Sequence, residues 1–211
     1  MLLLLDLDNT LIDRTAAFKA WAGTRFGPEE VTWLTREDRD GYRPREELAA
    51  VIAARYGLDP AEALTELRAG MVEHVELDPR VAQALGAVAA AGFVPVVVTN
   101  GTVAQQEAKL RHTGLDRLVA GWVISEGAGV RKPDRRMFEQ AATLVGHTLS
   151  DGGWMVGDHP EFDIAGGTAA GLRTGWGSAG RPWPSESPRP TATAADCAAL
   201  LHGVLDLSRR G

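Results

Sequence analysis

The chain begins with the stretch MLLLLDLDNTLID, residues 1–13, in which four leucines run into two acids, Asp6 and Asp8. An apolar run without polar alternation predicts a strand buried on both faces, as in the middle of a parallel sheet. The two acids then lie at the carboxyl end of that strand, where ligands bind in open α/β sheets. Carboxylates are costly to bury unless a cation or a reaction uses them. The stretch therefore predicts a central strand and a functional site beside it.

From Asp78 onward, strand-like and helix-like segments alternate. Apolar and β-branched runs predict strands at residues 94–98, 122–124, 154–156 and 172–176. Capping residues, prolines and glycines between them predict helices, and a last helix follows the proline-rich piece 180–190, which is predicted as a surface loop. Strands alternating with helices imply right-handed crossovers, so we predict an α/β fold with a doubly wound, Rossmann-like parallel sheet.

The segment between the first strand and residue 78 carries helix signals only. Apolar side chains recur at helical spacing, and Asp59-Pro60 is typical of a helix start. The more polar stretch 29–43 is predicted as a connection. We therefore predict an α/β core formed by residues 1–13 and 79–211, with an all-helical domain of residues 14–78 inserted into it.

Composition narrows the classes of partner. The 211 residues carry a net charge of -6, and the sequence pI is near 5.4, which argues against nucleic acid or an anionic membrane as the main partner. The opening leucines are too few for a signal peptide, no later stretch is predicted to span a bilayer, and the single Cys197 allows no internal disulfide. We expect a cytoplasmic protein, and its oligomeric state stays open.

Four polar clusters fall at the ends of predicted strands or in the loop after one. They are Asp6 with Asp8, the run Thr99-Asn100-Gly101, Lys132, and Asp158 with Asp163. Because the carboxyl ends of parallel strands share one edge of the sheet, these side chains are expected to converge although they are far apart in sequence. Such convergence points to a site more strongly than any single cluster does.

In this order the clusters resemble the four motifs of the haloacid dehalogenase-like hydrolase superfamily, in which most members are phosphatases. The resemblance rests on DLDNTL from residue 6, Thr99, Lys132-Pro133 and GDHPEFD from residue 157. It covers essentially the whole chain, because residues 14–78 lie where such proteins insert a small helical cap of the C1 type. It implies a capped α/β core with phosphatase-type motifs.

The resemblance assigns the acids their roles. Asp6 is expected to be the nucleophile that forms an aspartyl-phosphate. Asp8 is expected to protonate the leaving oxygen and then activate water, while its backbone carbonyl binds the metal. Dehalogenases of the superfamily lack an acid at this second position, so Asp8 favours phosphoryl transfer. Asp158 is expected to complete a Mg²⁺ site with Asp6.

The same resemblance places the phosphate on the other two motifs. Thr99 and the backbone N–H groups of Asn100 and Gly101 lie between a strand end and a helix start, which is a ready anion site. Lys132 is expected to put a fixed positive charge on the phosphoryl group and to orient Asp6. Without the other motifs, Asn100-Gly101 reads as an ordinary turn and Lys132 as a solvated lysine.

Two residues of the last motif have open roles. Asp163 is predicted either to support the metal site, as an outer ligand or behind the ligands, or to cap the following helix. His159 stands where many members of the superfamily carry a small hydroxyl residue, and it is predicted either at the rim of the site or as an ordinary surface histidine.

The inserted helical segment is expected to choose the substrate. Arg39 and Arg43 are candidate substrate-binding residues, because guanidinium groups suit a second anionic feature such as a carboxylate or phosphate. The alternative is a solvated surface in which interleaved acids pair with these arginines.

The predicted function is therefore that of a Mg²⁺-dependent phosphatase for a small phosphorylated metabolite. A phosphomutase, a 5'-nucleotidase or a pyrophosphatase of the same superfamily remains an alternative, because all of them use the same core residues. A phospho-accepting receiver domain also places acids, a Thr and a Lys around Mg²⁺. It differs in two ways: its phosphorylated Asp does not sit two residues from its acid partner, and it has no place for the helical insertion. A catalytically idle interaction domain is disfavoured by the intact motifs.

Overall fold

The computed structural model describes residues 1–184, 186 and 188–209. The chain divides into two compact units, one formed by Met1–Ile12 with Leu77–Gly211 and the other by Asp13–Glu76. We call them the core unit and the helical unit. The helical unit enters the core unit directly after the first strand and its turn, so the core unit is built from two separate stretches of chain.

The core unit contains one parallel sheet, which in the described residues has six strands in the order β3-β2-β1-β4-β5-β6. The strands are β1 Leu2–Leu5, β2 Val94–Thr99, β3 Gly121–Ile124, β4 Trp154–Gly157, β5 Arg173–Gly177 and β6 Ala192–Ala194. Strand β1 lies between β2 and β4, with Leu4 opposite Val96 on one side and Met155 on the other. Its four leucines have no exposed surface, so the predicted doubly wound α/β fold with a buried first strand is confirmed.

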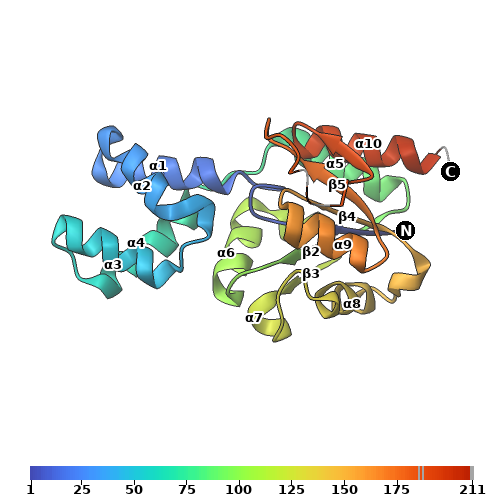
Figure 1. Ribbon diagram of the computed structural model, residues 1–211, viewed down its shortest axis with the longest axis horizontal. Coiled ribbons are helices and arrows are strands. Elements are labelled where there is room, and N and C mark those ends of the chain that lie inside the picture. The colour runs from blue at the N-terminus through green and yellow to red at the C-terminus, as the bar shows by residue number, and fades with distance from the viewer. Residues whose placement is uncertain (185, 187, 210–211) are drawn as a thin grey trace. The chain divides into compact units, whose positions relative to one another are not determined.

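Helices cover both faces of this sheet. They are α5 Pro79–Ala90, α6 Val103–Thr113, α7 Ser125–Ala128, α8 Arg135–Leu144, α9 Gly166–Ala169 and α10 Cys197–Arg209. Helices α5 and α10 pack together on one face, and α8 and α9 lie on the other (Figure 1). The crossover from β3 to β4 passes under β2 and β1, which places α8 opposite α5 and makes the sheet doubly wound.

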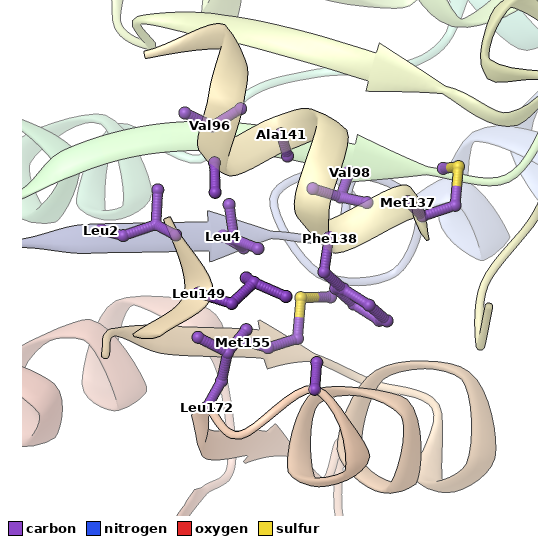
Figure 2. Packing of buried hydrophobic residues seen from close by; sticks show 12 residues of the cluster. Leu2, Leu4, Val96, Val98, Met137, Phe138, Ala141, Leu149, Met155 and Leu172 are labelled. Carbon is purple, nitrogen blue, oxygen red and sulfur yellow. The ribbon is translucent and has the colours of Figure 1, made fainter. Parts of the chain in front are cut away.

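The face under α8 carries one apolar cluster. Alternate residues of the strands point into it, as the two-residue period of a strand requires. Figure 2 shows Leu2 and Leu4 of β1 beside Val96 and Val98 of β2, with Phe138 of α8 in the same cluster. Because these strands are held by apolar contacts on both sides, the residues that follow them are presented at a rigid edge of the sheet.

The structure adds two elements to the core unit that the sequence analysis did not predict. Strand β6 was not predicted, because its Ala-Thr-Ala run is short and lacks an apolar signal. Residues 125–128, between the predicted strand 122–124 and the loop that carries Lys132, form the single-turn helix α7. The predicted loop 180–190 contains Ser185 and Ser187, which lie outside the described residues.

The helical unit contains α1 Arg14–Phe26, α2 Val31–Asp38, α3 Arg45–Tyr56 and α4 Pro60–Glu73, with short 3₁₀ turns at Pro28–Glu30 and Arg39–Gly41. The prediction of residues 29–43 as a polar connection was therefore wrong, because they carry α2. This two-turn helix buries little more than Leu34 and Asp38, so its apolar signal is weak. The N-cap at Asp59 is confirmed: its carboxylate accepts from the N–H groups of Ala61 and Glu62.

Aromatic packing holds the helical unit together. Phe18 and Trp21 of α1 are buried, and Phe26 stacks on Tyr56 of α3 with ring centroids 4.2 Å apart. Helix α4 approaches α1 at Gly70, where a Cβ atom would stand 1.9 Å from Trp21 Cδ1. Only a glycine allows this contact, so Gly70 sets the distance between the two helices.

Candidate active site

Both the backbone and the side chain of Asp6 are held by hydrogen bonds. It directly follows β1, and its N–H donates to the carbonyl of Val156, which continues the β1–β4 pairing by one residue. Its carboxylate accepts from Lys132 Nζ at 2.6 Å and from Thr10 Oγ1 at 3.3 Å. The side chain is 10% exposed, so this carboxylate is largely shielded from water beside a buried ammonium.

A tight turn over residues 7–12, which contains Asp8, follows Asp6 and redirects the chain. The carbonyl of Leu7 accepts from the N–H groups of Thr10, Leu11 and Ile12, and Asn9 has a φ of 59°, a left-handed conformation that asparagine tolerates. The two carboxylates consequently point to different partners. Asp6 contacts Lys132, whereas Asp8 contacts helix α6.

Lys132 is held by its backbone as well as by its ammonium. Its N–H donates to Asn100 Oδ1 at 2.9 Å, and Asn100 Nδ2 donates back to the Lys132 carbonyl at 3.2 Å. Its Nζ contacts Asp6 Oδ1 and Asp163 Oδ1, each at 2.6 Å. Burial alone lowers the pKa of an amine, but Asp163 and Asp6 outweigh burial and raise the pKa of Lys132. The lysine is therefore a fixed positive charge.

Asp163 is fully buried and belongs to the carboxylate cluster. Its Oδ1 accepts from Lys132, and its Oδ2 accepts from the N–H of His159 at 2.9 Å. A Cβ atom at position 157 would lie 2.2 Å from Asp163 Oδ2, so Gly157 is needed for the carboxylate to pack against the strand end. Of the open alternatives, helix capping does not describe Asp163, because its side chain bonds back to Lys132 and His159.

Asp158 is held by two residues from later in the chain, Trp176 and Arg181. Arg181 Nη2 donates to its Oδ2 at 3.0 Å and to its carbonyl at 2.8 Å, and Trp176 Nε1 donates to the same carbonyl. Burial and then the neighbouring Asp163 raise the pKa of Asp158 to about 7, although Arg181 opposes the shift. The pKa of Asp6 is raised as well, first by burial and then, against the lowering effect of Lys132, by Asp163 and Asp158.

Among the described residues, Asp6, Asp158 and Asp163 form a group suited to a metal ion. One carboxylate oxygen from each lies within 4.8 Å of the others, and all three residues are buried. Oxygen-only donors suit a hard divalent cation such as Mg²⁺. Burial first, and the neighbouring carboxylates after it, raise the pKa values of Asp6 and Asp158, and a divalent cation would offset both effects. The residues therefore fit the metal that the motifs predict.

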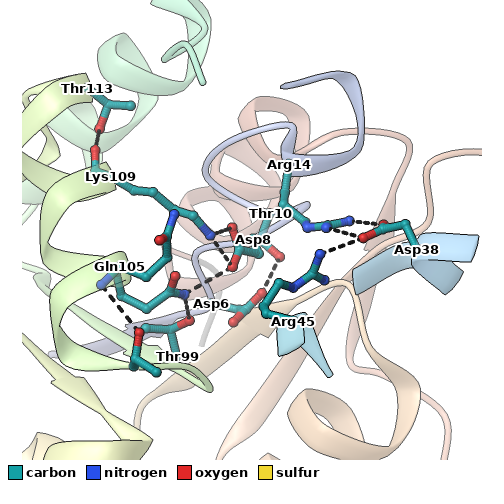
Figure 3. A network of polar contacts seen from close by, with 12 residues as sticks. Asp6, Asp8, Thr10, Arg14, Asp38, Arg45, Thr99, Gln105, Lys109 and Thr113 are labelled. Carbon is teal, nitrogen blue, oxygen red and sulfur yellow. Dashed lines mark hydrogen bonds and ion pairs between the residues drawn. The ribbon is translucent and has the colours of Figure 1, made fainter. Parts of the chain in front are cut away.

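Asp8 lies in a second polar network, centred on helix α6 (Figure 3). Lys109 Nζ contacts both of its carboxylate oxygens, at 2.7 and 2.8 Å, and Gln106 Nε2 donates to its Oδ2 at 3.0 Å. Gln106 Nε2 also donates to Thr99 Oγ1 at 2.7 Å. The Asp8 side chain is thus outside the metal group, and its predicted metal contact through the backbone carbonyl stays a prediction.

The three residues Thr99, Asn100 and Gly101 were predicted as one phosphate-binding run, but each has a different hydrogen-bond partner. Thr99 ends β2 and is buried, and its hydroxyl oxygen faces Gln106. The side chain of Asn100 clamps the backbone of Lys132. The N–H of Gly101 donates to Ser125 Oγ at 3.0 Å, so we do not carry Gly101 forward as a phosphate donor.

His159 acts as a helix cap. Its Nδ1 accepts from the N–H groups of Glu161 and Phe162, at 3.2 and 3.1 Å, and its ring stacks on Phe162 with centroids 4.1 Å apart. This role requires an unprotonated Nδ1. Burial lowers the pKa of His159, which favours that neutral form. A histidine therefore does here what a hydroxyl residue does at other helix starts.

Arg39 and Arg43, the candidate substrate-binding residues of the inserted segment, lie in the helical unit. Arg43 forms an ion pair with Glu37, as the solvated-surface alternative expects, and Arg39 occupies a left-handed conformation with φ 53°. A buried cluster nearby was not predicted: Asp38 accepts from Arg14 Nη2 at 2.6 Å and from Arg45 Nη1 at 2.7 Å (Figure 3). Whether Arg39 and Arg43 bind substrate stays a prediction.

Sequence reasoning missed three residues of the core unit that contact the predicted acids: Gln106, Lys109 and Arg181. A signal for the first two was present. Helix α6 covers a sheet, yet its sequence VAQQEAKLRHT offers few apolar residues for a buried face. Arg181 had no such signal, because it lies in a proline-rich piece without periodicity.

Comparison with known proteins adds a sequence relationship to this geometry. The profile of the family described as haloacid dehalogenase-like hydrolase matches residues 1–171. Pyrimidine 5'-nucleotidase YjjG of Escherichia coli is 39% identical over 99 residues, which are 47% of this chain and 44% of the nucleotidase. Phosphoserine phosphatase of Thermus thermophilus is 35% identical over 85 residues, 40% of this chain and 34% of the phosphatase. The chain therefore spans less than half the length of these curated relatives.

Solved structures share the fold over nearly the whole chain. HAD-hydrolase YfnB from Bacillus subtilis, bound to magnesium, has a TM-score of 0.76 at 23% identity, covering 96% of this chain and 97% of YfnB. L-2-haloacid dehalogenase from Xanthobacter autotrophicus has a TM-score of 0.77 at 16% identity, covering 97% and 98%. No helix in the described residues is long and apolar enough to cross a membrane.

Proposed function

The chain belongs to the haloacid dehalogenase-like hydrolase family, and we propose that it is a Mg²⁺-dependent phosphatase that acts on a small phosphorylated metabolite. The observation that carries this proposal is the position of Lys132. Its buried ammonium joins Asp6 to Asp163, beside Asp158, at the carboxyl edge of the sheet. A nucleophilic carboxylate, a fixed cation and a set of metal-binding oxygens are the parts that phosphoryl transfer needs.

In the proposed first step, a carboxylate oxygen of Asp6 attacks the phosphorus and the bond to the leaving oxygen breaks. Asp8 donates a proton to that oxygen, so the product leaves as a neutral alcohol. Lys132 and the hydroxyl of Thr99 neutralise and hold the phosphoryl oxygens. Mg²⁺, held by Asp6, Asp158 and Asp163, would supply the charge that offsets repulsion between the nucleophile and its anionic substrate.

In the proposed second step, water attacks the phosphorus of the aspartyl-phosphate. Asp8, now ionised, removes a proton from this water, and the phosphoryl–oxygen bond to Asp6 breaks to release inorganic phosphate. The two steps return Asp6 and Asp8 to their starting states. A phosphomutase differs only in the acceptor, since a second substrate hydroxyl takes the place of water.

Asp8 favours phosphate esters over haloacids as substrates. The solved structures that share this fold include dehalogenases, so the fold leaves both reactions open. Dehalogenases of the family lack an acid at the second position of the first motif, and this chain has Asp8 there, bonded to Lys109 and Gln106. The curated relatives include a 5'-nucleotidase and a phosphoserine phosphatase, which supports phosphate monoesters as the substrate class.

We further propose that residues 14–78 form a cap that selects the substrate, with Arg39 and Arg43 as its candidate anion-binding residues. The positive charge of a guanidinium suits a second anionic group on the substrate. The core residues serve nucleotides, phosphorylated amino acids and phosphorylated sugars alike, so the choice among these substrates falls to the residues of this unit.

The first experiment is phosphate release from p-nitrophenyl phosphate, with Mg²⁺ or with EDTA. We expect turnover that needs Mg²⁺, no turnover above background for Asp6→Asn, and a loss of roughly 10²- to 10⁴-fold for Asp8→Asn on an alkyl phosphate. Halide release from a 2-haloacid is measured in parallel. Halide release without phosphate release, or full activity of Asp6→Asn, would overturn the proposal.

A further inference from the structure

Helix α6 turns two polar side chains toward the core unit's interior. Gln106 is 2% exposed and Lys109 is 4% exposed. Lysine is almost never buried this far unless it is paired, and its burial is costly even then. An apolar pair at these positions would satisfy the packing of the helix at lower cost, so the polar pair requires a reason beyond packing.

Lys109 holds the whole carboxylate of Asp8. Its Nζ lies 2.7 Å from Oδ1 and 2.8 Å from Oδ2, so the ammonium sits between both oxygens. The Asp8 side chain is itself 25% exposed, which leaves it reachable from solvent. Lys109 therefore fixes the direction of a carboxylate that would otherwise sample several rotamers.

Gln106 joins Asp8 to Thr99. Its Nε2 carries two hydrogens and has two acceptors, Asp8 Oδ2 at 3.0 Å and Thr99 Oγ1 at 2.7 Å. Because Thr99 Oγ1 accepts from Gln106, its own hydrogen points elsewhere. The hydroxyl is thereby turned into a donor, which is the role that phosphate binding demands of it.

Local sequence explains how α6 delivers both side chains. Thr102 caps the helix by accepting from the N–H of Gln105, and the three-residue spacing of Gln106 and Lys109 puts them on one face. A Cβ atom on Gly101 would lie 2.9 Å from Gln106 Cγ. The glycine after Asn100 therefore makes room for the glutamine.

We propose that Gln106 and Lys109 are positioning residues for the reaction: Lys109 fixes the direction of the Asp8 side chain, so that its carboxyl group faces the leaving oxygen when protonated and the attacking water when ionised, and Gln106 orients the hydroxyl of Thr99 toward the phosphoryl group. This inference rests on the proposed phosphatase function. It assigns the two residues no contact with the reacting atoms, since each acts through a partner.

The test of Lys109 uses the leaving group. A proton donor matters for an alkyl phosphate, whose alkoxide leaves poorly, and matters little for p-nitrophenyl phosphate. The ratio kcat/KM reports steps up to cleavage of the ester, so the later hydrolysis does not obscure it. For Lys109→Met we expect kcat/KM to fall about 30-fold or more on an alkyl phosphate and less than about 5-fold on p-nitrophenyl phosphate. Lys109→Arg should restore part of the alkyl activity.

The matched control is Arg111→Met, because Arg111 lies exposed on the same helix and pairs with Glu107 at the surface. It should leave both substrates unchanged. Lys109→Met should fold, since methionine fills the space of the lysine stem and Asp8 can hydrate. Equal losses on both esters, or no loss on either, would overturn the role of Lys109. If the wild-type protein hydrolyses neither ester, the proposed function itself fails and the inference falls with it.

Gln106→Glu tests the other half at nearly constant shape. The carboxylate accepts where the amide donated, so it captures the hydrogen of Thr99 and repels Asp8. We expect competitive inhibition by inorganic phosphate to weaken by about 10-fold, as a lost charge-assisted donor implies. Gln106→Glu with unchanged phosphate inhibition would show that Gln106 does not orient Thr99.

Discussion

Lys132 is the residue at which three sequence motifs meet. Its ammonium contacts Asp6 from the first motif and Asp163 from the last, and its backbone is clamped by Asn100 from the second. Two carboxylates share this one cation, and Asp158 has Arg181 as its partner. This buried cluster therefore has three carboxylates for two cations. A divalent cation would balance the excess negative charge.

The pKa values of these acids predict how Mg²⁺ and pH act together. Burial, with the neighbouring Asp163, raises the pKa of Asp158 to about 7 in the folded chain from an ordinary 3.8, so between these pH values the folded protein holds a proton that the unfolded chain releases. A carboxyl group whose pKa is higher in the folded than in the unfolded protein stabilises the fold less and less as the pH rises from about 4 through 7. Mg²⁺ needs the ionised carboxylate, so its binding is favoured at the upper end of this range. We expect the Tm in EDTA to fall from pH 6 to pH 8, and Mg²⁺ to raise the Tm more at pH 8.

Thermal unfolding in EDTA and in Mg²⁺ checks this at both pH values. Asp158→Asn is the matched control, because it removes the titrating group and a metal ligand while it keeps the shape. It should show a smaller fall in EDTA and little response to Mg²⁺. A larger Mg²⁺ effect at pH 6 than at pH 8 in the wild-type protein would speak against the carboxylate site.

At the residue scale, the sequence predicted the acids and the lysine but not what holds them. Asp6 and Asp158 were predicted because each directly follows a strand within a recognisable motif, and Lys132 because it lies in the motif of the loop after a strand. Lys109 was not, because the scarcity of apolar residues on α6 does not show that this particular lysine points inward toward Asp8. Its burial becomes visible only when the helix is packed on the sheet. A contact such as that between Asp8 and Lys109, which lie far apart in the sequence, can be found only from the three-dimensional structure.

At the scale of elements, long apolar runs were predictable and short ones were not. Strand β1 was predicted because its leucines leave no ambiguity. Strand β6 covers Ala192–Ala194 at the edge of the sheet, where weak burial produces no apolar pattern. Helix α2 was missed for a related reason, since its buried residues include the charged Asp38. Hydrophobic periodicity therefore does not predict elements that are weakly buried or that bury charged residues.

Asp38, the last residue of α2, joins three helices of the helical unit. It is buried between Arg14 of α1 and Arg45 of α3, and burial, which raises the pKa of Asp38, is outweighed by these arginines, which lower it. Asp38→Ala leaves Arg14 buried without its partner, which costs about 3–5 kcal/mol. We expect the free energy of unfolding of this unit to fall by that amount in urea denaturation.

An exposed ion pair of the same unit provides the comparison. Arg25 and Glu66 lie 2.8 Å apart, and their side chains are 41% and 45% exposed. Because solvent screens such a pair, Glu66→Ala should cost less than about 1 kcal/mol. Equal costs for Asp38→Ala and Glu66→Ala would mean that the buried cluster does not stabilise the unit.

At the scale of the whole molecule, the fold explains why a site forms from distant residues. The strand order puts β1 between β2 and β4, so the residues that follow these three strands share one edge. The helical unit is inserted where the chain leaves that edge, directly after the turn that follows Asp8. A substrate-selecting role for this unit is consistent with its point of insertion and stays a proposal.

The central claim is that Asp6 carries the phosphoryl group between the two steps. Acid quenching during turnover of p-nitrophenyl phosphate, followed by mass spectrometry of peptides, tests it directly. Asp8→Asn is the variant of choice, because p-nitrophenolate leaves without a proton while hydrolysis of the intermediate lacks its base. We predict one phosphoryl group on Asp6 that needs Mg²⁺ and is absent from Asp6→Asn. Turnover with no phosphoryl group on Asp6, or with one on another residue such as His159, would contradict the account.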